Sequence, residues 1–362
     1  MSIRDDLKER KLPPLRSREE MVEIVQREIF GYLPNVSATW SVSEPVNIEP
    51  WYMSGTVCHS YVNFTIEFEG GSHTFRIDRL LHKDGQKRPL ILYNNFHPME
   101  SSKYVPREEL TEYDADFLIY CYQDITSDNG DFTTGIAPYL LPNGKVGATT
   151  CGKIGLWAWA NMRVLDYALT LLGTDEKNIG ILGHSRLGKT AMYTGMLDER
   201  IKFVFSSAAG CAGDALAHGG SGLKNPTAKP LTRGEMISDI TGQFPYWFCE
   251  NYYKYAEKNY SDDFDQHFLL ATIAPRYMMV CSYDIDVWAD PASEQLCALA
   301  ASEAWERQGL TGLVGCDRYL VPEEKLIDGH VGYFMHKGWH FCGRHTWRAF
   351  MEFIEKHKND EN

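Results

Sequence analysis

The chain has 362 residues, of which 44% are hydrophobic and 13% aromatic, and it carries a formal net charge of −13. This apolar content suits a folded α/β chain with a sizeable core and argues against disorder. The acidic balance argues against nucleic acid or an anionic membrane as a partner. No run approaches the ~18 consecutive apolar residues of a transmembrane helix. Because residues 1–20 are densely charged and lack the apolar core of a secretory signal, we expect a cytoplasmic location.

The first predicted element is an amphipathic helix over 17–34, with Ser17 as its N-cap. A β-hairpin follows over 61–82, turning at Gly70-Gly71. After the hairpin the pattern changes to short apolar runs, which suit parallel strands buried on both faces. These runs cover 88–95, 116–124, 178–185, 203–209 and 276–283. Helical periodicity covers 153–172, 291–308 and 344–357.

Strands that alternate with helices predict an α/β fold with a doubly wound, mostly parallel sheet and helices on both faces. We expect one domain over 1–362, with a substrate-side loop insertion over 214–245 that contains a Gly-, Pro- and Lys-rich stretch. The nine cysteines include no C-x-x-C pair, and several lie in apolar runs such as "IYCYQ" and "MMVCSY". We therefore expect buried, reduced thiols rather than a disulfide framework.

The sharpest corner in the chain is "ILGHSRLGKTA", where Ser185 ends an apolar run and opens a predicted helix. In an α/β sheet, ligands bind beyond the carboxyl ends of the strands. A tight strand–turn–helix exposes the serine hydroxyl and aims free helix N–H groups at negative charge forming there. Gly183 matches the first glycine of the G-x-S-x-G elbow, while Gly188 stands one place later than the second. Ser185 is therefore a candidate nucleophile, with an ordinary helix-capping serine as the alternative.

A serine nucleophile in this fold needs an acid and then a histidine further along the chain. The segment "CSYDIDVWADP" supplies Asp284, Asp286 and Asp290 after the last of these apolar runs. The segment "DGHVGYFMHKGWHFCGRHTW" supplies His330, His336, His340 and His345. Both groups lie where the template requires them, and the residues alone do not choose among them.

One pair in the second segment also has the spacing of metal ligands. His336 and His340 are four residues apart, as on one face of a helix. Lys337-Gly338 would break such a helix, and the sequence offers no obvious third ligand. We therefore expect no metal and no other cofactor.

These residues together resemble the glucuronoyl esterases, carbohydrate esterase family fifteen. The family motif G-x-S-R-x-G-K is matched throughout by "GHSRLGK". The segments "WAWANMRVLDY", "LDERIKFVFSSAAGCAG", "FPYWFCENYYKY", "DQHFLLATIAPR" and "DVWADP" are also similar to the family. The resemblance covers roughly residues 85 to 355 and implies an α/β-hydrolase fold.

The resemblance implies a catalytic role for four residues. Ser185 is the expected nucleophile, His340 the base, and Arg186 a donor to the oxyanion. Asp286 is the expected acid, because it matches the family aspartate two residues before the tryptophan. Ala208 or its neighbour stands where many members carry a glutamate instead.

Three further expectations concern the residues around these four. Asp290 ranks second as the acid, because it precedes a proline and is typical of a helix N-cap. Lys189, Glu235 and Trp288 are expected to bind the sugar. The cysteines that flank the serine and the histidine in fungal members are His184 and Phe341 here, so that disulfide is absent.

The implied function is hydrolysis of glucuronoyl esters through an acyl-enzyme, without a cofactor. The expected partner is a small-molecule or oligosaccharide ester. Two alternatives remain open: a sugar deacetylase of the same fold, and a catalytically idle relative that binds carbohydrate. The sequence leaves the sugar, the alcohol and the oligomeric state open.

Overall fold

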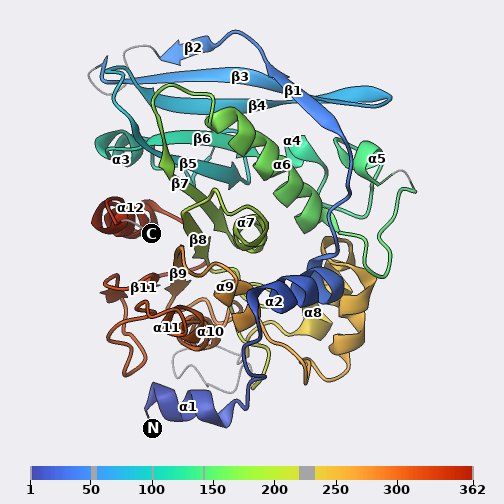
Figure 1. The fold of residues 1–362 in the computed structure, drawn as a ribbon, viewed down its shortest axis with the longest axis vertical. Helices are drawn as coiled ribbons and strands as arrows, with labels where there is room; N and C mark the ends of the chain where they lie inside the picture. Colours follow the sequence, from blue (N-terminus) through green and yellow to red (C-terminus); the bar gives the residue numbers. More distant parts are fainter. Residues whose placement is uncertain (1, 50–54, 100–101, 142, 220–232, 361–362) are drawn as a thin grey trace.

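The computed structural model describes residues 2–49, 55–99, 102–141, 143–219 and 233–360. Within these ranges the chain forms an 11-stranded sheet in the order β1-β3-β4-β6-β5-β7-β8-β9-β11-β10, with β2 paired to β3 (Figure 1). The strands are β1 Ala38–Val42, β2 Val46–Glu49, β3 Val57–Phe68, β4 Gly71–His82, β5 Arg88–Asn95, β6 Asp116–Cys121, β7 Thr174–His184, β8 Phe203–Ser207, β9 Tyr277–Tyr283, β10 Lys325–Leu326 and β11 Val331–His336. The six neighbouring strands β6, β5, β7, β8, β9 and β11, in that order across the sheet, pair in parallel. This confirms the predicted mostly parallel sheet.

Helices cover both faces of this sheet. They are α1 Ile3–Glu9, α2 Arg18–Val25, α3 Arg107–Glu112, α4 Tyr122–Ile125, α5 Ala137–Leu140, α6 Lys153–Ala168, α7 Arg186–Leu197, α8 Ile237–Gln243, α9 His267–Ala271, α10 Pro291–Ala301, α11 Glu303–Glu306 and α12 Arg344–His357. Shorter turns of other helix types are η1 Gln26–Phe30, η4 Pro245–Trp247 and η5 Glu250–Ala256. Helices α12 and α3 lie on one side of the sheet and α6 and α7 on the other (Figure 1).

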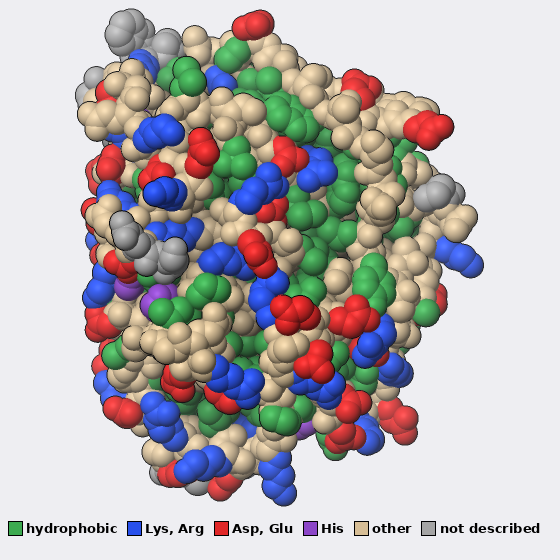
Figure 2. All heavy atoms as spheres, viewed as in Figure 1, with side chains coloured by type: hydrophobic (Ala, Val, Ile, Leu, Met, Phe, Trp, Pro, Cys, Tyr) green, Lys and Arg blue, Asp and Glu red, His purple; other side chains and the backbone are tan. Residues whose placement is uncertain are grey.

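The core divides along the same line. The side chains of α6, α7, α9 and α10 pack into one buried apolar cluster, and those of α12 into a second cluster across the sheet. Strands β5 and β9 are buried along their whole length, because both of their faces are covered. Over the face seen in Figure 2, charged side chains of both signs are interspersed with apolar ones.

Several predicted elements differ in their bounds. The helix predicted over 17–34 is α2, which Ser17 caps as predicted. It continues into the π-helical turn η1 and ends at Phe30. The predicted helix over 291–308 is interrupted at Ser302, whose hydroxyl donates to the Ala298 carbonyl and accepts from the Leu313 backbone N–H. This side chain competes for backbone groups that a continuous helix would use.

Two predictions concern the domain organisation: the loop insertion and the single domain. The predicted insertion over 214–245 lies partly outside the described residues, and its described C-terminal part forms α8. The single domain over 1–362 stays a prediction.

All nine cysteines are free, and only Cys58 is not buried. Among the described helices, none combines the length and the apolar character needed to span a bilayer.

Candidate active site

The turn between β7 and α7 places Ser185 at the carboxyl edge of the sheet in a strained conformation. Its φ of 57° and ψ of −128° lie outside the regions that most residues adopt. A Cβ at Gly183 would lie 1.8 Å from the Leu187 carbonyl oxygen, so only glycine fits there. A Cβ at Gly188 would lie 3.0 Å from that of Ala209, because α7 passes close to the sheet. The sequence thus uses two glycines to fold this corner tightly.

The hydroxyl of Ser185 does not cap its own helix. Ser185 stands at the N-cap position of α7, yet its side chain makes no capping hydrogen bond. Its backbone carbonyl accepts from the Gly188 N–H at 2.8 Å, and its N–H donates to the Ser207 carbonyl at 2.8 Å. The backbone therefore holds the residue while the hydroxyl is left for other chemistry, unlike an ordinary capping serine.

The structure brings one aspartate and one histidine of the candidate groups together. Nδ1 of His340 lies 2.6 Å from Oδ2 of Asp286, whose side chain is only 8% exposed. Asp290 instead caps α10, where it accepts from the backbone N–H and the hydroxyl of Ser293. Asp286 follows β9 and His340 follows β11, so both come from the same edge of the sheet as Ser185.

A second histidine packs against His340. The ring centroids of His184 and His340 are 4.4 Å apart. Burial, and then the neighbouring His340, hold the pKa of His184 well below its usual value of 6.5. Tyr104 contacts both the His184 ring, at 5.5 Å, and the Phe341 ring, at 5.2 Å. Aromatic packing through Tyr104 thus joins His184 and Phe341.

Arg186 forms an ion pair with one acidic side chain and cation–π contacts with aromatic side chains. Its guanidinium pairs with the carboxylate of Asp128, and it lies 4.7 Å from the Trp247 ring centre and 5.3 Å from that of Phe244. Asp128 also accepts hydrogen bonds from Trp247 Nε1 at 2.7 Å and Tyr122 Oη at 2.8 Å. Within the described part of the chain, the buried Nε of Arg186 has no hydrogen-bond partner.

The residues predicted to bind sugar also lie together. Lys189 is buried and donates to the Ala209 carbonyl, and burial lowers its pKa although Glu235 opposes the change. Burial raises the pKa of Glu235, while Lys189 and a hydrogen bond from Trp288 oppose that change. The backbone N–H of Glu235 donates to the Trp288 carbonyl at 2.8 Å. Trp288 is 37% exposed, so part of its ring faces solvent.

All seven predicted residues line one cavity of about 390 Å³. Its walls are Ser185, Arg186, Lys189, Ala208, Ala209, Gly210, Glu235, Gln243, Phe244, Trp247, Asp286, Trp288, Ala289 and His340. Two cavities with larger volumes, about 660 and 760 Å³, have no histidine in their walls. The smaller cavity therefore has the chemistry of a site: a hydroxyl, an imidazole with a carboxylate, and two cations.

Sequence reasoning missed two features beside this cavity. Asp128, in the loop "TSDNG", has no sequence signal, because only the fold brings it to Arg186. The second is a buried carboxyl pair, Asp214 and Glu294, which both accept from the Gly210 N–H. Desolvation, and then Asp214, raise the pKa of Glu294 well above its usual value of 4.5.

The chain is similar to known carbohydrate esterases. The family model for fungal glucuronyl esterases matches residues 135–309. A carbohydrate esterase, MZ0003, from an unknown prokaryotic organism is 33% identical over 242 residues, or 66% of this chain and 52% of that protein. A 4-O-methyl-glucuronoyl methylesterase of Hypocrea jecorina is 34% identical over 168 residues, or 46% of this chain and 35% of that enzyme. The chain thus spans about half the length of the first relative and about a third of the second.

A solved structure covers nearly the whole chain. A promiscuous CE15 esterase from a marine bacterial metagenome superposes with a TM-score of 0.80, covering 94% of this chain and 91% of that one at 23% identity. This likeness shows the fold, which is that of an α/β-hydrolase. Within that class, the resemblance to the glucuronoyl esterases of carbohydrate esterase family fifteen is confirmed.

Proposed function

We propose that this protein is a serine-dependent carbohydrate ester hydrolase that cleaves glucuronoyl esters through an acyl-enzyme. The observation that carries the proposal is the 2.6 Å contact between His340 Nδ1 and Asp286, in a cavity that Ser185 also lines. A carboxylate at Nδ1 holds the imidazole in the tautomer whose Nε2 accepts a proton. His340 then takes the proton of Ser185 as its oxygen attacks the ester carbonyl, and returns it to the leaving alcohol. Water completes the reaction by cleaving the acyl-enzyme.

The oxyanion of the tetrahedral intermediate needs donors that are already in place. The free N–H groups at the start of α7 supply one set, because Ser185 immediately precedes this helix. Arg186 supplies a second, and its place in the wall of the same cavity as Ser185 supports that role. A single donor of this kind is typically worth about 3–4 kcal/mol in the transition state.

The sugar specificity rests on three residues and on the names of the relatives. Glu235 accepts hydroxyl hydrogen bonds, Trp288 offers an aromatic face, and Lys189 reaches toward the uronate ring. A curated relative is called a 4-O-methyl-glucuronoyl methylesterase, so a uronic acid ester is the substrate class we propose.

We also propose a reducing, cytoplasmic location, in which the substrate is a small uronate ester. The nine free cysteines support it, because secreted chains usually pair their thiols. When the protein is denatured and alkylated directly from its native cells, its mass should show nine alkyl groups, one on each cysteine. Fewer than nine would argue for an oxidising compartment.

One substrate panel tests the function. The purified protein should hydrolyse methyl and benzyl glucuronate faster than acetylated xylo-oligosaccharides, and Ser185→Ala should abolish all hydrolysis while unfolding at the wild-type temperature. Faster hydrolysis of the acetyl esters would favour a deacetylase. No hydrolysis of any ester by the wild type would leave a carbohydrate-binding relative.

A further inference from the structure

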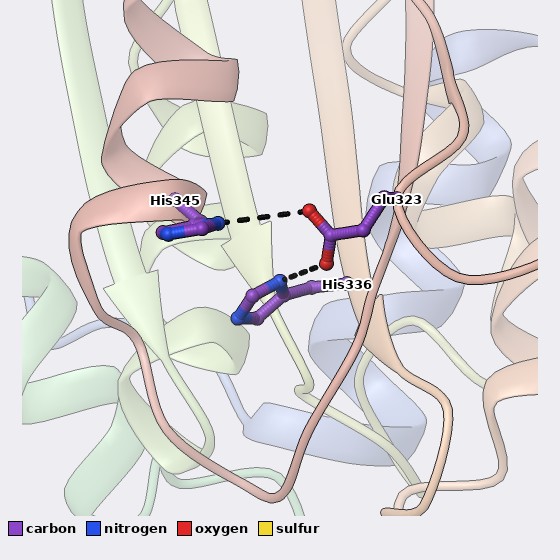
Figure 3. Close-up of side chains that lie close together, drawn as sticks. All are labelled: Glu323, His336 and His345. Carbon is purple, nitrogen blue, oxygen red and sulfur yellow. Dashed lines mark hydrogen bonds and ion pairs between the residues drawn. The ribbon is translucent and has the colours of Figure 1, made fainter.

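A second group of side chains, outside the cavity, has the composition of a metal site. Glu323, His336 and His345 point toward one another, with the Nδ1 atoms of both histidines directed at the two carboxylate oxygens (Figure 3). Nδ1 of His336 lies 2.9 Å from Oε1, and Nδ1 of His345 lies 3.6 Å from Oε2. Sequence spacing had paired His336 with His340, but the fold pairs it with His345 instead.

These distances suit a zinc ion. Zinc binds imidazole nitrogen and carboxylate oxygen at about 2.0–2.2 Å, so neighbouring ligand atoms lie about 3–3.5 Å apart. The three ligand atoms already lie within 4.8 Å of one another, so rotations of the exposed Glu323 and His345 side chains would complete the geometry. The Asp284 carboxylate adds negative charge near His336, which favours a cation there.

Two residues of this cluster lie at the two ends of the segment that carries His340. His336 is the last residue of β11, and His345 lies in the first turn of α12. Between them runs the segment 337–343, which carries His340 and has no regular secondary structure. Trp339 in this segment is 72% exposed and Phe341 is 38% exposed. An ion held at both ends of the segment would restrict its motion.

We propose that Glu323, His336 and His345 bind one zinc ion, which braces the loop that carries His340. The ion takes two imidazole nitrogens and a carboxylate from the chain, and water fills the remaining position. It lies beside the catalytic loop rather than in the cavity and does no chemistry on the substrate. Its effect is to narrow the range of positions that the His340 ring samples.

The first experiment measures zinc binding. The full chain is treated with a chelator to remove bound metal and is then titrated with zinc chloride in a calorimeter. We expect one zinc ion per chain with a Kd of about 10 µM or tighter. Glu323→Gln and His345→Asn should each weaken binding at least about 10-fold, since even residues that only support ligands have effects of this size. Glu324→Gln is the matched control, because this carboxylate pairs with Arg318 and lies outside the cluster. Magnesium should not compete, since it prefers oxygen ligands.

Two further measurements separate the site from the active site. His340→Ala should bind zinc as the wild type does, because His340 is not a ligand. Chymotrypsin should cut the wild type after Trp339 or Phe341 at least about 3-fold more slowly with zinc, as expected when binding suppresses local opening, and Glu323→Gln should show no such protection. Neither measurement involves an ester, so the result is independent of the proposed activity.

Three results would overturn the proposal. The first is wild-type binding no tighter than that of Glu323→Gln, when circular dichroism shows both folded. The second is loss of zinc binding in His340→Ala, which would place the ion in the active site. The third is tight binding without any change in the rate of chymotrypsin cleavage, which would mean that the ion does not brace the loop.

Discussion

The corner at Ser185 and the loop at His340 meet in one cavity, but they are fixed by different means. At the corner, backbone hydrogen bonds and two glycines hold the serine between a buried strand and a buried helix. At the loop, His340 is 41% exposed and is held by side chains: Asp286 through a hydrogen bond and His184 through ring packing. Ser185 is thus positioned by the fold itself, whereas His340 depends on its neighbours.

This difference shows where substitutions should act on chemistry without acting on the fold. A change at Gly183 or Gly188 alters the backbone, and therefore stability and activity together, whereas Ser185→Ala removes only the hydroxyl. A change around the loop removes one support of the base and leaves the sheet intact. The four predictions below run from the largest expected effect to the smallest.

Asp286→Asn removes the support of His340 and should have the largest effect. The amide favours the wrong imidazole tautomer, so kcat should fall by about 10⁴ while the unfolding temperature stays close to that of the wild type. The measurement is kcat on benzyl glucuronate. Asp290→Asn is the control, and it should cost at most about 1–2 kcal/mol of stability through the start of α10. If instead Asp290→Asn were the inactive variant, the two aspartates would have the opposite roles.

Asp128→Asn tests whether the corner also relies on a side chain. The amide still fits between Trp247 and Tyr122, but it no longer neutralises Arg186, so the guanidinium should lose its fixed orientation. We expect kcat to fall about 10- to 100-fold, because one oxyanion donor contributes 10²–10³-fold. KM should change little, and the pH profile should keep its shape, because His340 is untouched. Asp131→Asn, at an exposed aspartate of the same loop whose side chain accepts from the Thr133 N–H and hydroxyl, should retain wild-type kcat.

Glu235→Ala and Trp288→Ala should affect sugar esters alone. Each lost hydrogen bond to a carboxylate costs about 1.5–3 kcal/mol, and these contacts also position the ester. We expect kcat/KM on benzyl glucuronate to fall about 10- to 100-fold, while para-nitrophenyl acetate is hydrolysed as before. An equal loss on both substrates would indicate damage to the catalytic residues. No loss on either would replace the uronate proposal with a general esterase.

Glu294→Gln should change stability with pH and have the smallest effect. The raised pKa of Glu294 means that the native state keeps a proton that the unfolded chain releases above about pH 4.5. The unfolding free energy of the wild type should therefore fall with rising pH relative to the variant, by up to about 1.4 kcal/mol per pH unit. The glutamine keeps a hydrogen-bond donor toward Asp214. Urea unfolding from pH 4.5 to 8 measures the difference.

The control for that prediction is Glu303→Gln, an exposed carboxylate that pairs with Arg307. Its unfolding free energy should follow the wild-type pH dependence. If Glu294→Gln also followed the wild type, then Glu294 would be ionised in the native state, and another group would hold the proton.

The sequence by itself determined the elements whose signals are local. Gly183, Ser185 and Gly188 predicted the strand–turn–helix because steric demands of a tight turn act between near neighbours. Continuous apolar runs predicted the parallel core, since strands covered on both faces have no polar side to show. Ser17 likewise predicted the start of the N-terminal helix, because a capping box spans only four residues.

Only the tertiary structure decided contacts between residues far apart in the chain. Position after the strand does not choose between Asp286 and Asp290, and the preference for Asp286 came from the family resemblance and the N-cap pattern at Asp290. Only the fold shows that one faces His340 and the other caps a helix. Asp128 reaches Arg186 across 58 positions, and Glu323 reaches His336 across 13, and neither contact leaves a periodic signal. The physical reason is that such contacts follow from how strands and loops converge at the carboxyl edge of the sheet. Local propensity specifies the elements, whereas their packing specifies which side chains meet.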